Sequence, residues 1–235
     1  MLQFVLFDYD GTMAPTSERQ FDWFKYWWNH DENSEVVKKG DFKRVFPYDN
    51  LNSFMVMYNE KLHLSGGVQN VYDFLGLKCD MNDKNHPVWP AYQNFLSENP
   101  SRLYPGMKEA VEEIHNTGNL SNNPMRNKRL RIGINTTNTW KSVYKDLKQN
   151  DVLKYFDCFV TEEILSFYDG NGNQNSIKKP SKISLALALG LLDSDGNYTI
   201  HVGDTLNDLA ASQKVIRLNP LHPETLITVG VSWGY

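Results

Sequence analysis

Carboxylates stand where apolar runs of this sequence end. The run in "FVLFDYDGT" is followed by Asp8 and Asp10, and "YTIHVGDTLND" places Asp204 and Asp208 after a second run. Carboxylate oxygens are hard ligands of the kind that holds Mg²⁺. If both runs are strands of a parallel sheet, their carboxyl ends meet at the edge where ligands bind. The sequence therefore predicts a magnesium site at that edge.

A hydroxyl and an ammonium group complete this set. "INTT" ends another apolar run with Thr136 and Thr137, and "KKP" presents Lys178 and Lys179. Such groups hold the oxygens of a phosphate, so we expect a phosphorylated ligand. Taken by themselves, these residues leave open which threonine and which lysine take part.

Each aspartate also has a structural explanation of its own. Asp10 before Gly11 is typical of a simple turn. Asp204 could cap a helix whose first turn contains Asp208. The joint occurrence of the four motifs at the ends of apolar runs favours chemistry over these separate explanations.

The elements that must position these residues follow from the apolar pattern. Strands are predicted for 2–8, 130–137, 157–161, 198–204 and 214–218. Helical spacing is found between them, over 104–118, 140–152 and 181–192. Strand followed by helix, repeated, predicts a doubly wound, Rossmann-like α/β core with a parallel sheet.

Residues 17–100 interrupt this rhythm with helical patterns and no buried strand. We predict a helical domain there, inserted into an α/β core formed by 1–16 and 101–235. Its segment "FDWFKYWW" could line a specificity pocket, but aromatic residues at helical spacing favour packing. The Gly- and Asn-rich residues 166–180 are expected to form a long exposed loop.

The four motifs occur in the order "DYDGT", "INTT", "KKP" and "GDTLND". In this the sequence resembles the haloacid dehalogenase superfamily. The resemblance implies that Asp8 is a nucleophile that becomes an aspartyl phosphate and that Asp10 is the general acid and base. It also implies phosphatase or phosphomutase chemistry, because dehalogenase and phosphonatase relatives lack the second acid. The insertion resembles the family's helical cap, which closes over the active site and selects the substrate, and this implies a small phosphorylated metabolite as the substrate.

The resemblance further implies which residues hold the ligands. The phosphoryl oxygens would be bound by Thr136 and Lys179, and Mg²⁺ by the Asp8 carboxylate, the Asp10 backbone carbonyl and Asp204, with Asp208 in support. Thr136 is preferred to Thr137 because Val143 and Leu147 then fall where the family's next helix carries apolar residues. Lys179 is preferred to Lys178 because it directly precedes the proline.

These observations lead us to expect a Mg²⁺-dependent phosphatase of a small phosphate monoester. A sugar phosphomutase of the same fold, or a catalytically silent binding module, are the alternatives. The tail "ITVGVSWGY" resembles the phosphoglycolate phosphatase branch, but the chain stops at Tyr235 without that branch's terminal helix. One face of the sheet could then be exposed, and either a monomer or a homodimer is expected.

Composition excludes several other classes. The formal net charge of -4 argues against a nucleic-acid or anionic-membrane binder. No apolar run approaches the roughly 18 residues needed to span a bilayer, and no leader precedes the first strand, so we expect a cytoplasmic protein. Cys79 and Cys158 support neither a disulfide scaffold nor a zinc site.

Overall fold

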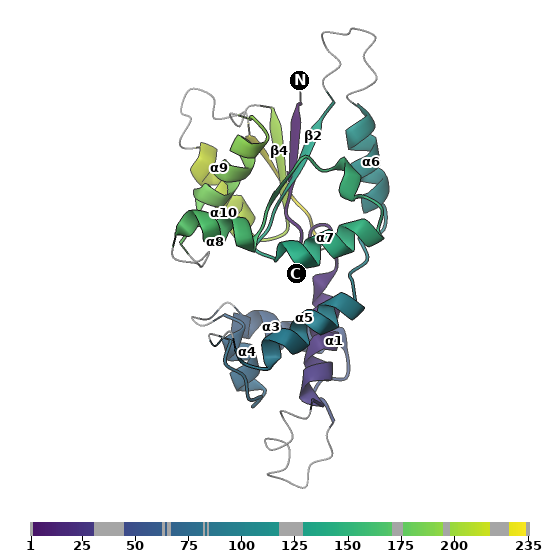
Figure 1. Cartoon of the computed structure of the whole chain (residues 1–235), viewed down its shortest axis with the longest axis vertical. Coiled ribbons are helices and arrows are strands. Elements are labelled where there is room, and N and C mark those ends of the chain that lie inside the picture. Colours follow the sequence, from purple (N-terminus) through teal and green to yellow (C-terminus); the bar gives the residue numbers. More distant parts are fainter. Residues whose placement is uncertain are drawn as a thin grey trace. The chain divides into compact units, whose positions relative to one another are not determined.

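The computed structural model describes residues 2–30, 45–62, 64, 67–81, 83, 85–117, 129–170, 176–194, 198–216 and 226–233. The chain divides into two compact units (Figure 1). The first, which we call the α/β unit, is formed by Met1–Pro15 and Pro100–Gly234, and the second, the helical unit, by Thr16–Asn99.

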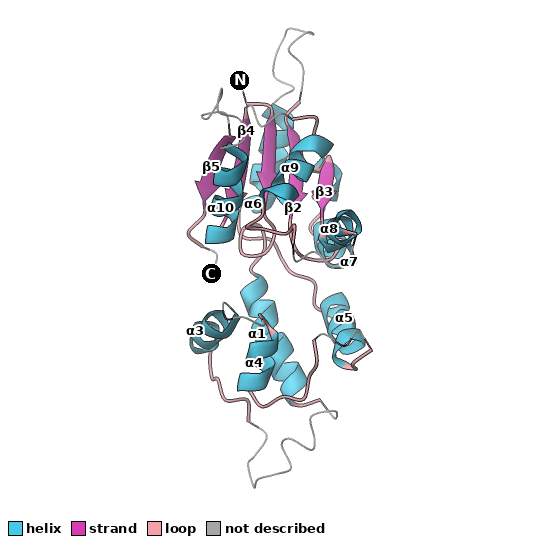
Figure 2. Cartoon of the chain, turned by 90° about the vertical axis from the view of Figure 1, so that its left-hand side faces the viewer, coloured by secondary structure: helices cyan, strands magenta, loops and turns pink. Residues whose placement is uncertain are grey.

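Five parallel strands form the sheet of the α/β unit, in the order β3-β2-β1-β4-β5. Their bounds are β1 (Phe4–Phe7), β2 (Arg131–Asn135), β3 (Cys158–Val160), β4 (Thr199–Gly203) and β5 (Leu226–Gly230). β1 lies at the centre and pairs with β2 and β4, so the carboxyl ends of these three strands are neighbours (Figure 2). The predicted doubly wound α/β fold is confirmed.

Helices cover both faces of this sheet (Figure 1). One face packs against α6 (Met107–Thr117) and α7 (Trp140–Gln149), and the other against α8 (Glu162–Asp169), α9 (Lys182–Leu191) and α10 (Leu206–Ile216); a 3-10 turn, η3 (Leu153–Tyr155), follows α7. In β1, Val5 and Phe7 join the first core and Leu6 joins the second. Burial on both faces explains why β1 is a continuous apolar run rather than an alternating one.

The helical unit has its own core. It contains α1 (Thr16–Trp28), α3 (Leu51–Leu62), α4 (Gln69–Phe74) and α5 (Val88–Glu98). Four aromatic side chains of "FDWFKYWW" are buried in this core, namely Phe21, Trp23, Phe24 and Trp27. The Trp23 indole also donates a hydrogen bond to the Tyr72 hydroxyl at 2.7 Å. These four rings therefore pack in the core of the helical unit.

The strand predicted for 214–218 is wrong. α10 continues to Ile216, because Ala211 and Val215, one turn apart, both pack into the core below α9. Residues 217 and 218 lie outside the described part of the chain. The fifth strand is β5, in the tail segment. There only Leu226 is buried, so the sequence shows no buried run of the usual kind.

The loop predicted for 166–180 is also wrong at its start. Residues 166–169 continue α8, which Leu165 anchors in the core. The helix ends at Gly170, whose φ of 74° is a left-handed conformation that glycine adopts without strain. Residues 171–175 lie outside the described part, and 176–180 form turns.

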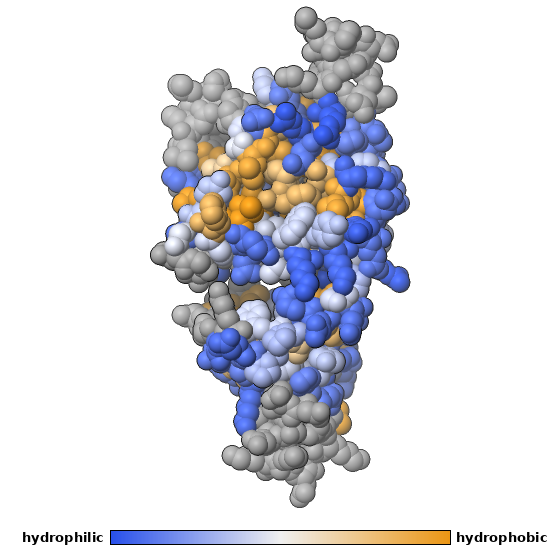
Figure 3. All heavy atoms as spheres, in the orientation of Figure 1, coloured by the Kyte–Doolittle hydropathy of each residue, from blue (hydrophilic) through white to orange (hydrophobic). Residues whose placement is uncertain are grey.

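Apolar side chains remain on the surface of the α/β unit, and Figure 3 shows a patch of them on the face turned to the viewer. Ile227 and Val229, on the edge strand β5, are exposed as well. Among the described residues, no helix is long and apolar enough to cross a membrane. Cys79 and Cys158 are free thiols.

Gly133, on β2, tests how closely the sheet packs. A Cβ at this position would lie 2.5 Å from Cys158 Sγ and 2.7 Å from Leu6 Cδ2. We expect Gly133→Ala to lower the free energy of unfolding by about 1–3 kcal/mol through overpacking. Gly190, in α9, is the matched control, because nothing lies within 4 Å of its Cβ position. Gly190→Ala should stabilise by up to about 1 kcal/mol through helix propensity. Urea unfolding of both variants measures this; equal effects would contradict the packing of β2.

Candidate active site

Asp8 follows β1 directly and is held by the sheet. Its backbone N–H donates to the Val202 carbonyl at 2.8 Å, which extends the pairing of β1 with β4 by one residue. The chain then turns at Gly11, which has a φ of 78°, and the N–H groups of Met13 and Ala14 donate to the Tyr9 carbonyl. This tight loop fixes Asp8 and Asp10 at the carboxyl end of the central strand.

The Lys179 ammonium lies at the centre of the site. It forms buried ion pairs with Oδ1 of Asp8 and, at 2.6 Å, with Oδ1 of Asp208. It also donates to the Asn135 carbonyl at the end of β2, at 3.0 Å. Burial alone would lower the pKa of Lys179, but the two carboxylates outweigh burial and raise that pKa above its ordinary value. Lys179 is therefore a permanent cation that joins three elements.

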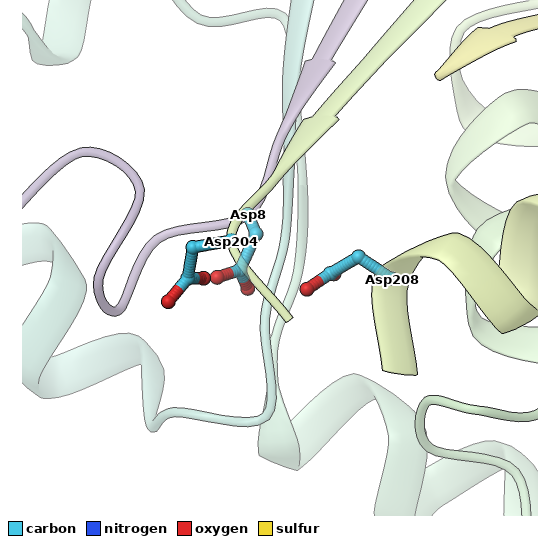
Figure 4. Close-up of side chains that lie close together, drawn as sticks. All are labelled: Asp8, Asp204 and Asp208. Atoms are coloured by element: carbon cyan, nitrogen blue, oxygen red, sulfur yellow. The ribbon is translucent and has the colours of Figure 1, made fainter. Parts of the chain in front are cut away.

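Three carboxylates converge beside this cation. Oxygens of Asp8, Asp204 and Asp208 lie within 4.8 Å of one another, from the ends of β1 and β4 and the first turn of α10 (Figure 4). The Thr12 hydroxyl lies between two of them, 3.1 Å from Asp204 Oδ1 and 3.4 Å from Asp8 Oδ2. The Thr205 N–H donates to Asp208 Oδ2 at 3.2 Å. Asp208 is thus oriented from both sides.

Asp10 belongs to a neighbouring group. Its Oδ2 accepts a hydrogen bond from the Thr136 hydroxyl at 3.3 Å, and its Oδ1 accepts one from the Asn138 side-chain amide at 3.1 Å. The Asn138 N–H in turn donates to the Thr136 hydroxyl oxygen at 3.1 Å. These contacts bring the end of β2 and the loop after β1 together, and they hold a half-buried carboxylate beside Asp8.

The structure thus brings together all six residues predicted for the site: Asp8, Asp10, Thr136, Lys179, Asp204 and Asp208. Thr136 and Lys179 are buried, whereas Thr137 is exposed and Lys178 is half-buried. Three further contributors, Thr12, Asn138 and Thr205, were missed. Thr12 and Thr205 stand inside the motifs "DYDGT" and "GDTLND", and Asn138 directly follows "INTT", so the sequence signal for all three is a polar residue in the turn after a strand.

Burial is the largest single influence on the pKa values of this cluster, and neighbouring charges add to it or oppose it. Burial raises the pKa of Asp8 well above its usual value, Lys179 opposes this, and Asp208 and Asp10 add to it. For Asp208, burial is outweighed by Lys179 and by hydrogen bonds, so its pKa is lowered. His201, on β4, is buried, and its Nδ1 lies 2.7 Å from the Ser212 hydroxyl oxygen. Burial lowers the pKa of His201 to about 4. His201 is therefore a neutral core residue near pH 7.

The donor set fits a magnesium ion. Asp8, Asp204 and Asp208 supply carboxylate oxygens, which are the ligands that Mg²⁺ prefers. When ionised, Asp8, Asp10, Asp204 and Asp208 together carry four negative charges, whereas the Lys179 ammonium carries one positive charge. A divalent cation would compensate the remainder.

Comparison with known proteins identifies the class of this site. The family model of the haloacid dehalogenase-like hydrolases matches residues 5–216. The chain belongs to this family, as its four motifs predicted, and is an enzyme, a hydrolase.

Relatives agree with this assignment. Pyrophosphatase PpaX of Bacillus mycoides (strain KBAB4) is 25% identical over 232 residues, which are 97% of this chain and 83% of that protein. A candidate β-phosphoglucomutase from Thermotoga maritima has a TM-score of 0.61 at 18% identity, covering 100% of this chain and 88% of its own. CbbY from Rhodobacter sphaeroides, solved in complex with phosphate, has a TM-score of 0.58 at 20% identity over 100% of this chain and 88% of its own. The two solved structures show the shared fold.

The buried ion pairs predict the effect of removing the cation. We expect Lys179→Met to lower the free energy of unfolding by about 3–5 kcal/mol in chelator, because it leaves buried carboxylates without their partner. Lys178→Met, one residue earlier and half-buried, is the control and should change it by less than about 0.5 kcal/mol. Urea unfolding at neutral pH compares them; similar values for both variants would mean that the ion pairs do not support the fold.

Proposed function

We propose that the protein is a Mg²⁺-dependent phosphatase that hydrolyses a small phosphate monoester through an aspartyl phosphate on Asp8. The observation that carries the proposal is the Lys179 ammonium between Asp8 and Asp208, with Asp204 beside them. Such a cluster suits a reaction in which negative charge moves between a carboxylate and phosphoryl oxygens. Membership of the hydrolase family and a relative named as a pyrophosphatase support this chemistry.

The first step makes the phosphoenzyme. An oxygen of Asp8 attacks phosphorus, the bond from phosphorus to the leaving alcohol breaks, and Asp10 gives its proton to that alcohol. In the second step Asp10 takes a proton from water, the water oxygen attacks phosphorus, and the bond to Asp8 breaks. Phosphate is released and both aspartates return to their starting states.

The remaining residues bind and orient. Lys179 and Thr136 are proposed to hold the phosphoryl oxygens, because both lie beside the reacting carboxylates and can donate hydrogen bonds. The hydrogen bonds of Asp10 with Thr136 and Asn138 keep its carboxylate at the site. Because Asp10 is only half-buried, we propose that a leaving group can reach this carboxylate.

Magnesium would be held by the Asp8 carboxylate, the Asp10 backbone carbonyl and Asp204, with Asp208 in support. When bound, Mg²⁺ supplies positive charge that stabilises the phosphoryl oxygens during transfer. We further propose that residues 17–100 act as the cap that selects small substrates, since the motifs of the site all lie outside this stretch.

Metal removal gives the first test of this proposal. We expect hydrolysis to vanish after exhaustive chelation and to return with added Mg²⁺, because the like charges of the aspartates then lose their counter-ion. Phosphate release is measured across a panel of sugar phosphates, other small monoesters and pyrophosphate, without any bisphosphate activator. Full activity in chelator would contradict the metal assignment, and turnover only with a bisphosphate would indicate a phosphomutase.

The two aspartates of the first motif give the second test. Asp8→Asn should abolish turnover and weaken Mg²⁺ binding, because an amide is a poor nucleophile and not an anionic ligand. Asp10→Asn should keep Mg²⁺ affinity and lose about 10²- to 10⁴-fold in kcat on an alkyl phosphate. Its loss on p-nitrophenyl phosphate should be smaller, because that leaving group needs little protonation. Equal losses on both esters, with metal binding lost, would show that Asp10 has another role.

A further inference from the structure

Tyr9 stands between the two catalytic aspartates and is tied to a different element. It is completely buried and packs in the same apolar cluster as Val143 and Leu147 of α7. Its hydroxyl donates a hydrogen bond to Oδ2 of Asp146 at 2.8 Å. Asp146 also lies on α7 and is only 1% exposed. A buried hydrogen bond thus fastens the peptide between Asp8 and Asp10 to α7.

The same carboxylate holds the segment through which the chain returns from the helical unit. The α/β unit resumes at Pro100, and the N–H of Ser101 donates to Asp146 Oδ1 at 2.9 Å. At the C-cap of α7, the Asn150 side-chain amide donates to the Ser101 carbonyl at 3.0 Å, and the Leu103 N–H donates to Asn150 Oδ1 at 3.4 Å. Asp146 and Asn150 therefore hold residues 101–103 through three hydrogen bonds.

A backbone hydrogen bond connects the outgoing and returning segments directly. The N–H of Tyr104 donates to the Met13 carbonyl at 2.9 Å. Met13 belongs to the tight loop that follows Asp8 and lies two residues before Pro15, where the chain leaves the α/β unit. Hydrogen bonds thus join residues 8–14, residues 101–104 and the C-terminal half of α7, and Asp146 accepts one from each of the first two segments.

We infer that Asp146 is a positioning residue for the phosphatase reaction. By binding both Tyr9 and Ser101, it fixes the positions of Asp8 and Asp10 relative to the segment that begins at Pro100. The inference rests on the proposed function, which gives the two aspartates their roles. A carboxylate suits this place because its two oxygens satisfy a hydroxyl and a backbone amide at once. An apolar side chain would leave both donors buried without partners.

The expected consequence is a loss of kcat rather than of substrate affinity. Asp8 and Asp10 must reach opposite sides of the same phosphorus, and small misplacements of reacting groups are costly. Lys179 and Thr136, which would bind the phosphoryl group, are not contacted by Asp146 in any of these bonds. Because Asp10 protonates the leaving group, its displacement should affect alkyl phosphates more than aryl phosphates.

The experiment compares four variants of the full chain. Tyr9→Phe removes the donor, Asp146→Leu removes both acceptor oxygens at similar volume, and Asp146→Asn keeps an oxygen for the Ser101 N–H and an amide for the Tyr9 hydroxyl. Val143→Ala is the control, because Val143 is equally buried on the same helix. Each is assayed on an alkyl phosphate and on p-nitrophenyl phosphate, well below its melting temperature.

We expect Asp146→Leu to lose about 10- to 100-fold in kcat on the alkyl ester, with a smaller loss on the aryl ester and KM unchanged within about twofold. Tyr9→Phe should show the same pattern more weakly, Asp146→Asn should recover most of the rate, and Val143→Ala should stay near wild type. If Tyr9→Phe and Asp146→Leu lost no more kcat than Val143→Ala, the inference would be overturned. Should Asp146→Leu fail to fold, Tyr9→Phe decides alone.

A second readout separates this inference from the proposed function. Hydrogen exchange should quicken in both 8–14 and 101–104 when Asp146→Leu or Tyr9→Phe is compared with Val143→Ala. Unchanged exchange in either segment would overturn the coupling even in a working phosphatase. Conversely, if the wild type hydrolysed no phosphate ester, the proposed function would fail while the exchange result still decided whether Asp146 links the two segments.

Discussion

The buried Lys179 ammonium is the interaction on which the rest of the site depends. Two carboxylates that come from β1 and α10 can both be buried because this cation lies between them. Its third donor reaches the Asn135 carbonyl at the end of β2, so one side chain unites three elements. Without it, burial and mutual repulsion would force Asp8 and Asp208 to protonate or to separate.

Sheet topology supplies the second constraint. With β1 between β2 and β4, the residues that follow each strand necessarily meet at one edge. Asp208 approaches this edge so closely that a Cβ added to Gly203 would lie 2.5 Å from the Cβ of Asp208. Only glycine fits there, and the approach of α10 to β4 is what brings Asp208 to Lys179. Glycine at position 203 is therefore needed both for the packing of α10 against β4 and for the ion pair of Asp208 with Lys179.

Much of this arrangement could be predicted from the sequence, because strand ends of a parallel sheet have a known common edge. Asp8 and Asp204 were found in that way, whereas Lys179 was predicted from a loop motif by its place before the proline. The structure brings the three together, while their catalytic roles stay predictions. The strand at 214–218 was mistaken because Val215 and Ile216 favour strands by type, whereas the four-residue spacing from Ala211 reflects a helix packed in the core. The bond from Tyr9 to Asp146 joins positions 137 apart in sequence, and no local pattern predicts such a contact.

Asp8 is proposed to carry the phosphoryl group during turnover. The most direct measurement is mass spectrometry of peptides from enzyme that is quenched in acid during turnover of a phosphate monoester. We expect one phosphoryl group on the peptide that contains Asp8 of the wild type. The phosphorylated peptide should accumulate in Asp10→Asn and be absent from Asp8→Asn. A phosphoryl group on another residue, or continued hydrolysis by Asp8→Asn with no phosphoenzyme, would contradict this proposal.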